Sequence, residues 1–316
     1  MKLELRDGRA TREAYGEAIL ELGQKNPKIY VVDCDIGKSC KTVTFAKELP
    51  NQHVNVGIAE QNACNVGAGL ATCGKIPFVT TYAVFGSMRM LEQIRQEVCY
   101  PHLNVKIACS HGGFTPASDG ASHQGIEDYG IFRTIPNMTI LAPGDFDSTY
   151  ACVEAAAEFD GPVYLRFTRD KVPSLYNKGC KMVIGKANLL NEGCDVTIIT
   201  AGDILSKSVE ACKRLEAEGI STRLLDMFCI KPLDKEAVEK AILETKGIIT
   251  VEDHNIINGL GSAVGEIVAE SDNNCKFKRI GIQDQFGESA PYERLLAING
   301  ITVDNIVAAA KKMLNK

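Results

Sequence analysis

The chain contains no tryptophan, and aromatic residues make up only 6% of its 316 residues. No apolar run reaches the roughly 18 residues of a transmembrane helix, so no membrane span is expected. Lys and Arg number 35 against 40 Asp and Glu, a formal charge of −5. This balance argues against a protein that binds nucleic acid or anionic membranes. The charged N-terminal segment lacks the apolar core of a signal peptide, and we therefore expect a cytoplasmic protein.

Metal-binding patterns are also missing. The twelve cysteines include no C-x-x-C pair, and none clusters with histidine at the spacing of a metal site. Their scatter through apolar segments favours reduced cysteines that pack as small hydrophobic residues. We therefore predict no metal site on this chain. The glycines at 259–265 have the spacing G-x-G-x-x-x-G, which differs from that of a dinucleotide loop and indicates close helix packing.

Apolar segments of strand length alternate with helical segments along most of the chain. This alternation predicts parallel β-sheets that are covered by helices on both faces. The rhythm breaks at 171–194, a glycine-containing stretch typical of a linker and a short extended hairpin. We therefore predict two doubly wound α/β domains, residues 1–178 and 179–316. In such sheets, ligands bind beyond the carboxyl ends of the strands.

Individual elements follow from the same patterns. Asp203, Asp234 and Thr302 precede helical segments at positions typical of N-caps. Helices are predicted over 59–72, 88–98 and 126–133 and strands over 28–33, 76–81, 104–109 and 162–167, among others.

Glu60 lies near the start of the helix predicted over 59–72. A carboxylate in the first turn of a helix commonly complements the helix dipole. The neighbours of Glu60, among them Val56, Ile58 and Ala63, predict an apolar setting, in which desolvation favours the protonated acid. A carboxyl group in such a setting suits proton transfer.

A polar loop after the strand at 104–109 contains His111, Asp119 and His123. Two of the chain's five histidines therefore lie in this one loop. The loop could bind a polyhydroxylated substrate, act as acid and base, or hold a metal, although no third clear ligand is nearby. Arg169, which we place at the end of another strand, could form a surface salt bridge or bind a phosphate or carboxylate.

Several motifs together resemble those of one family. In the first predicted domain these are VGIAEQN, TTYAVF, SHGGFTPASDGASHQ and PNMTILAPGD, which resemble the pyrimidine-binding domain of transketolases. In the second, VTIITAGD, KPLD and VEDHNIINGLGS are similar to the transketolase C-terminal domain. The resemblance covers nearly the whole chain, in order. Transketolases hold Mg²⁺ and the diphosphate of thiamine with a G-D-G motif in an N-terminal domain, and no G-D-G occurs here. The chain is therefore identified as one half of a split transketolase.

The resemblance implies a cofactor site for thiamine diphosphate. Glu60 would hydrogen-bond N1′ of the aminopyrimidine and so promote loss of the thiazolium C2 proton. Phe85 would stack on the pyrimidine, and Tyr82 would form the neighbouring wall. Met88 stands where some members have a further aromatic residue.

The resemblance also implies a substrate site. Two histidines and an aspartate would line the substrate channel, and the histidines would act in catalysis. Arginine and serine side chains would hold the phosphate of a sugar phosphate. Ser118 stands where many transketolases have glutamate, which bears on substrate preference more than on reaction class. The implied residues are His111, His123, Asp119, Arg169, Arg12, Ser39 and Asp35.

The implied reaction transfers a two-carbon ketol unit from a ketose phosphate to an aldose acceptor. A separate N-terminal subunit would hold most of the diphosphate and Mg²⁺. We expect a homodimer of this chain within an α2β2 assembly, and no activity from this chain alone.

Three alternatives stay open. The chain could be the β subunit of a 2-oxoacid dehydrogenase, although those chains typically have a different histidine-rich loop. It could be half of a deoxyxylulose-phosphate-synthase-like enzyme, which is normally one long chain. A non-catalytic partner subunit is the third, and the joint presence of Glu60, Phe85, His111 and His123 argues against it. The second domain shows no obvious catalytic residue, and we interpret His254 as a surface or interface residue.

Overall fold

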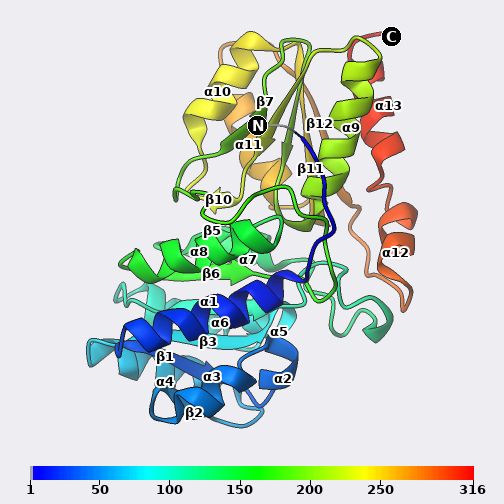
Figure 1. The fold of residues 1–316 in the computed structure, drawn as a ribbon. Helices are drawn as coiled ribbons and strands as arrows, with labels where there is room; N and C mark the ends of the chain where they lie inside the picture. Colours follow the sequence, from blue (N-terminus) through cyan, green and yellow to red (C-terminus); the bar gives the residue numbers. More distant parts are fainter. Residues whose placement is uncertain (1–2) are drawn as a thin grey trace.

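The computed structural model describes residues 3–316, and this part of the chain forms two mixed sheets (Figure 1). The seven-stranded first sheet has the order β10-β5-β6-β4-β3-β1-β2, and the five-stranded second sheet has the order β12-β11-β8-β9-β7. The strands of the first sheet are β1 (Ile29–Asp33), β2 (His53–Asn55), β3 (Ile76–Tyr82), β4 (Lys106–Ser110), β5 (Thr139–Leu141), β6 (Val163–Arg166) and β10 (Cys229–Lys231). Those of the second are β7 (Asn188–Asn191), β8 (Val196–Thr200), β9 (Thr222–Asp226), β11 (Gly247–Asn255) and β12 (Lys276–Ile282).

The predicted α/β class with two sheets is confirmed, with a difference at two edges. Neighbouring strands are parallel except for β10 against β5 and β7 against β9, which are antiparallel. The predicted hairpin near 171–194 is therefore wrong, because β7 pairs with β9, between 33 and 38 residues later, rather than with a local partner. Strand β10 belongs to the predicted second domain but joins the first sheet, where Cys229 pairs with Leu141. A strand of three residues is too short to show a period, which is why sequence patterns did not reveal it.

Helices cover both sheets, and the first sheet lies in the lower half of Figure 1. Helices α1 and α8 pack against each other. The helices of the first 160 residues are α1 (Thr11–Lys25), α2 (Gly37–Cys40), α3 (Val43–Glu48), α4 (Glu60–Thr72), α5 (Ala83–Met88), α6 (Leu91–Gln93), α7 (Asp128–Arg133) and α8 (Phe146–Glu158). The later helices are α9 (Leu205–Ala217), α10 (Lys235–Glu244), α11 (Leu260–Glu270), α12 (Tyr292–Ile298) and α13 (Val303–Met313). Short turns of other helix types are η1 (Pro50–Gln52), η2 (Ile94–Cys99), η3 (Ala117–Asp119) and η4 (Gly202–Ile204), of which η2 is π-helical.

Some predicted boundaries differ from the structure. The helix expected at 88–98 is divided between α6 and η2, and the helix expected at 126–133 begins at Asp128. Asp234 and Thr302 are N-caps, as predicted, because their side chains accept backbone N–H groups. The prediction for Asp203 is wrong: it lies inside η4, and its carboxylate accepts a hydrogen bond from Tyr292 instead.

The structure also bears on the glycines at 259–265 and on the cysteines, for which the sequence predicted packing roles. The glycines at the start of α11 allow close packing: a Cβ on Gly259 would lie 2.1 Å from Oε2 of Glu252. That carboxylate accepts the N–H groups of Leu260 and Gly261, so the helix N-terminus is occupied by the chain's own side chain. All twelve cysteines are free, and eight of them are buried. Within residues 3–316, no helix is long and apolar enough to cross a membrane.

Candidate active site

The carboxylate of Glu60 is buried at the start of α4, with 4% of the residue exposed. Its Oε1 lies 3.2 Å from Nη1 of Arg89, which follows the C-terminal end of α5. No described residue donates a hydrogen bond to Oε2. Glu60 is buried, but the predicted apolar setting is wrong in two respects. Arg89 supplies a cation, and Ile58 is 77% exposed.

Aromatic rings connect this carboxylate to the histidine loop. The Arg89 guanidinium lies over Phe85, 4.6 Å from the ring centroid. The Phe85 ring is 5.9 Å from Tyr82 and 5.7 Å from His123. Tyr82 lies 4.0 Å from the ring of His111. The sequence placed these groups on separate segments, and the carboxyl ends of β3 and β4 bring them together, because Tyr82 and Ser110 are paired in adjacent strands.

His111 is almost completely buried, whereas His123 is partly exposed. Burial, together with the positive charges of Arg12 and Arg169 and the nearby His123, lowers the pKa of His111 to about 3. The imidazole of His111 is therefore neutral near pH 7. Its Nδ1 lies 2.8 Å from the hydroxyl of Ser110. Met88 is exposed at the end of α5.

The predicted anion-binding residues Arg12 and Arg169 both lie close enough to His111 for their charges to lower its pKa. Arg169 donates to the carbonyl of Pro116 at 2.6 Å and forms an ion pair with Asp119 at 3.1 Å. The expectation that Arg169 ends a strand is wrong, because β6 stops at Arg166, three residues earlier. Arg12 Nη1 donates to the carbonyl of Ser39 at 2.9 Å, and its buried Nε has no partner among the described residues.

Asp35 is less closely tied to this group. It is exposed, with a left-handed backbone (φ 63°), and its Oδ1 accepts a hydrogen bond from Asn55 at 2.9 Å. No contact in the described chain joins Asp35 to His111 or Arg169. Its assignment to the substrate site therefore stays a prediction.

Of the two alternatives for His254, a surface residue or an interface residue, the surface alternative is wrong. The residue is fully buried, and its ring stacks on Tyr129 with centroids 4.9 Å apart. It lies near the end of β11, which contacts helix α7 beside the first sheet. Burial lowers the pKa of His254 to about 4. The sequence could not show this, because the neighbour that covers His254 is more than 100 residues away.

Three residues of the site were missed by the sequence analysis. Arg89 follows Phe85 by four residues, a helical spacing that could have linked the two. Ser110 directly precedes His111 but carries no pattern of its own. Cys40, whose thiol lies 3.3 Å from the Ser110 hydroxyl, was grouped with the structural cysteines.

The residues present fit part of a cofactor site. A buried carboxylate with one free oxygen lies beside a partly exposed phenylalanine ring, an arrangement that suits a flat, basic heterocycle. In residues 3–316, no group of three or more His, Cys, Asp or Glu side chains could hold a metal ion.

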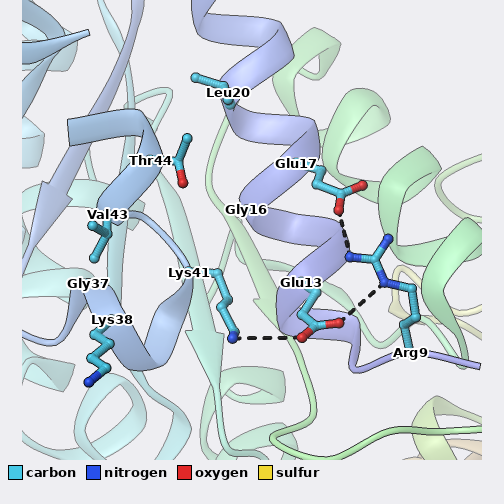
Figure 2. Close-up of a pocket in the computed structure, with 10 residues that line it drawn as sticks. All are labelled: Arg9, Glu13, Gly16, Glu17, Leu20, Gly37, Lys38, Lys41, Val43 and Thr44. Atoms are coloured by element: carbon cyan, nitrogen blue, oxygen red, sulfur yellow. Dashed lines mark hydrogen bonds and ion pairs between the residues drawn. The ribbon is translucent and has the colours of Figure 1, made fainter. Parts of the chain in front are cut away.

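A separate cavity of about 510 Å³ lies between α1 and the α2–α3 segment (Figure 2). Glu13 and Glu17 are among the residues that line it, and Arg9 and Lys41 form ion pairs with these carboxylates. The ten lining residues drawn there include none of the predicted site residues.

Comparisons with known proteins give two family matches and several similar chains. Residues 7–174 match the family described as "Transketolase, pyrimidine binding domain", and residues 185–306 match "Transketolase, C-terminal domain". A "transketolase C-terminal section" of Methanocaldococcus jannaschii is 42% identical over 307 residues, which are 96% of each chain.

Two further relatives extend the comparison. An apulose-4-phosphate transketolase subunit of Phocaeicola vulgatus is 39% identical, over 97% of this chain and 98% of the relative. A solved structure described as "Split gene transketolase, inactive beta4 tetramer" is 47% identical, with a TM-score of 0.89. The match covers 98% of this chain and 99% of that one.

Proposed function

The chain belongs to the transketolase family, and on that premise we propose that it is the pyrimidine-binding subunit of a thiamine-diphosphate-dependent transketolase. The observation that carries the proposal is the cluster of Glu60, Phe85, His111 and His123 at the carboxyl edge of the first sheet. Thiamine diphosphate, when bound, supplies a nucleophilic carbon and an electron sink for breaking a carbon–carbon bond.

Each residue of the cluster has a role in this function. Glu60 would bind a ring nitrogen of the aminopyrimidine with Oε2 and hold a proton there, while Arg89 fixes the orientation of the carboxylate. Phe85 would stack on the pyrimidine, with Tyr82 and Met88 beside it. Because Arg89 covers one face of the Phe85 ring, the pyrimidine would stack on the opposite face.

The substrate would lie against the histidine loop. His111, His123 and Asp119 would bind sugar hydroxyls, and Arg169 with Arg12 and Ser39 would hold a terminal phosphate. The unpartnered, buried Nε of Arg12 supports an anion at this point, because a buried donor without an acceptor is costly. The proposed reaction transfers a two-carbon ketol unit from a ketose phosphate to an aldose acceptor.

We assign the diphosphate and Mg²⁺ to a separate N-terminal subunit. Two facts support the assignment: no G-D-G motif occurs in the chain, and a relative of nearly equal length is named a C-terminal section. The homodimer and the α2β2 assembly are also proposals. The tetramer of β chains in the similar structure is described as inactive, which supports self-association of this type of chain and a need for a partner.

The test is a coupled transketolase assay with thiamine diphosphate, Mg²⁺, xylulose 5-phosphate and ribose 5-phosphate. The chain is measured alone and then with a candidate N-terminal subunit. We expect turnover only in the mixture. Failure with a partner that is shown to bind both the chain and the cofactor would contradict these substrates, and the same assay with other ketose phosphates or 2-oxoacids would then separate the alternatives.

Glu60→Gln tests the site, and Glu92→Gln is its matched control. The amide keeps the size of the side chain but cannot exchange a proton as the carboxyl group does, so turnover should fall about 10²- to 10⁴-fold. Glu92→Gln, on exposed surface nearby, should leave turnover unchanged. Normal turnover by Glu60→Gln would remove Glu60 from the mechanism.

A further inference from the structure

A buried chain of side chains ends on one ring nitrogen of His111. The thiol of Cys40 lies 3.3 Å from the hydroxyl of Ser110, and that hydroxyl lies 2.8 Å from Nδ1 of His111. All three residues are at most 2% exposed. Cys40 ends helix α2 and Ser110 ends strand β4, so the side chains that lead to Nδ1 come from two separate elements. The ring nitrogen left for a ligand is Nε2.

The number of available hydrogens decides which group donates and which accepts in each of these two hydrogen bonds. Burial raises the pKa of the Cys40 thiol to about 12, so the thiol keeps its hydrogen near pH 7. That hydrogen has two acceptors in reach, the Ser110 hydroxyl and, at 3.8 Å, the carbonyl of Thr81. Ser110 has one hydrogen and must give it either to Nδ1 or to the Cys40 sulfur. An imidazole nitrogen is the stronger acceptor, because thiol sulfur accepts only weakly.

We propose that Ser110 is a positioning residue that holds His111 with its single proton on Nε2. A neutral imidazole has one N–H, so an Nδ1 that accepts from Ser110 leaves the proton on the other nitrogen. His111 then donates a hydrogen bond to a substrate oxygen and does not remove a proton from it. This consequence for the substrate rests on the function proposed above, whereas the position of the proton does not.

The same molecule contains an internal reference with the opposite arrangement. Nδ1 of His254 lies 2.5 Å from the carbonyl oxygen of Asn255, which can only accept. Its Nε2 accepts the backbone N–H of Gly130 at 3.2 Å. His254 therefore carries its proton on Nδ1, and the structure assigns opposite tautomers to these two buried histidines.

The test is a long-range ¹H–¹⁵N correlation spectrum of the full chain with ¹⁵N-labelled histidine, recorded near pH 7. The ¹⁵N shift distinguishes a protonated from an unprotonated ring nitrogen, and His111→Gln and His254→Gln assign the two signals. We expect the proton of His111 on Nε2 and that of His254 on Nδ1. A His111 signal with the proton on Nδ1 would overturn the proposal, and if His111→Gln fails to fold, His111→Asn assigns the same signal.

Variants separate the role of Ser110 from general packing. Ser110→Ala should give a mixture of His111 tautomers, and Ser110→Thr, which keeps the hydroxyl, should restore the single one. Cys40→Ala should leave the tautomer unchanged, because Ser110 still donates to Nδ1. A change of tautomer in Cys40→Ala would show that Ser110 donates to the Cys40 sulfur and accepts from Nδ1 of His111. That result would contradict the proposal.

The assembled enzyme gives a second readout. Loss of an ordered hydrogen bond in Ser110→Ala should lower kcat about 5- to 10-fold, and Ser110→Thr should recover most of it. An unchanged kcat in Ser110→Ala, with mixed tautomers in the spectrum, would contradict the donor role toward the substrate. Absence of transketolase activity in the unmodified assembly would instead contradict the proposed function and would leave the spectroscopic result to stand by itself.

Discussion

Nη1 of Arg89 lies 3.2 Å from Oε1 of Glu60, and the same guanidinium covers the ring of Phe85. One exposed side chain thus touches both residues that we assign to the pyrimidine. Since the guanidinium orients the carboxylate and fixes the ring, Arg89 should affect cofactor binding more than folding.

We expect Arg89→Met to weaken thiamine diphosphate binding by the assembled enzyme about 2- to 5-fold, the scale of an exposed cation–π contact or ion pair. The free energy of unfolding should change by less than about 1 kcal/mol, because Arg89 is more than half exposed. Calorimetric titration and urea unfolding measure the two quantities. Arg95→Met, on exposed surface nearby, is the control, and equal binding by both variants would contradict the role of Arg89.

Arg169 is predicted to distinguish phosphorylated from unphosphorylated sugars. Pro116 and Asp119 hold its guanidinium, so it is ordered before a substrate arrives. Arg169→Ala should lower kcat/KM for a phosphorylated acceptor by about tenfold or more, as expected for a charge-assisted hydrogen bond. The kcat/KM for an unphosphorylated acceptor should fall far less in Arg169→Ala. In the control Lys171→Ala, kcat/KM should change little for either acceptor. Equal losses with both acceptors would show that Arg169 does not bind the phosphate.

His111 should not titrate between pH 5 and 8, whereas an exposed imidazole titrates near 6.5. The pKa of the folded state, about 3, lies below that of the unfolded state, so the unfolded chain binds the extra proton first. The stability that depends on this group is therefore present above pH 6.5 and is lost as the pH falls toward 3.

His111→Gln removes this dependence. Relative to the unmodified chain, the variant should gain on the order of 2 kcal/mol between pH 8 and pH 5 in urea unfolding. A pH-independent difference between His111→Gln and the unmodified chain would contradict the low pKa.

Asp226 provides a titration of the opposite sign. Burial raises its pKa to about 7, although Tyr176 donates a hydrogen bond to its Oδ2 at 2.6 Å. The folded chain therefore holds this proton where the unfolded chain has lost it, and stability falls as the pH rises from about 4 to about 7. Asp226→Asn should become more stable relative to the unmodified chain over that window. Thermal unfolding at pH 5 and pH 8 measures the change, and a constant difference would contradict the raised pKa.

The order of segments and the residue types of the candidate site could be predicted from the sequence because both are local, whereas the roles of those residues stay predictions. The start of α4 at Glu60 follows from the sequence around it, and the polar composition of the loop with His111 and His123 is visible in a window of thirteen residues. Short elements were harder: β10, with three residues, is defined by its partner β5 and not by its own pattern. The boundary between the predicted domains at residues 178 and 179 stays a prediction.

The sequence by itself determined which residue types stand at the ends of which strands, since periodicity and loop composition are properties of neighbouring residues. Only the tertiary structure decided their partners. Arg89 meets Glu60 across 29 residues, Cys40 meets Ser110 across 70, and His254 is covered by Tyr129. These contacts depend on strand order and on how helices pack over the sheet, and the energies of desolvation and pairing that set protonation arise only there.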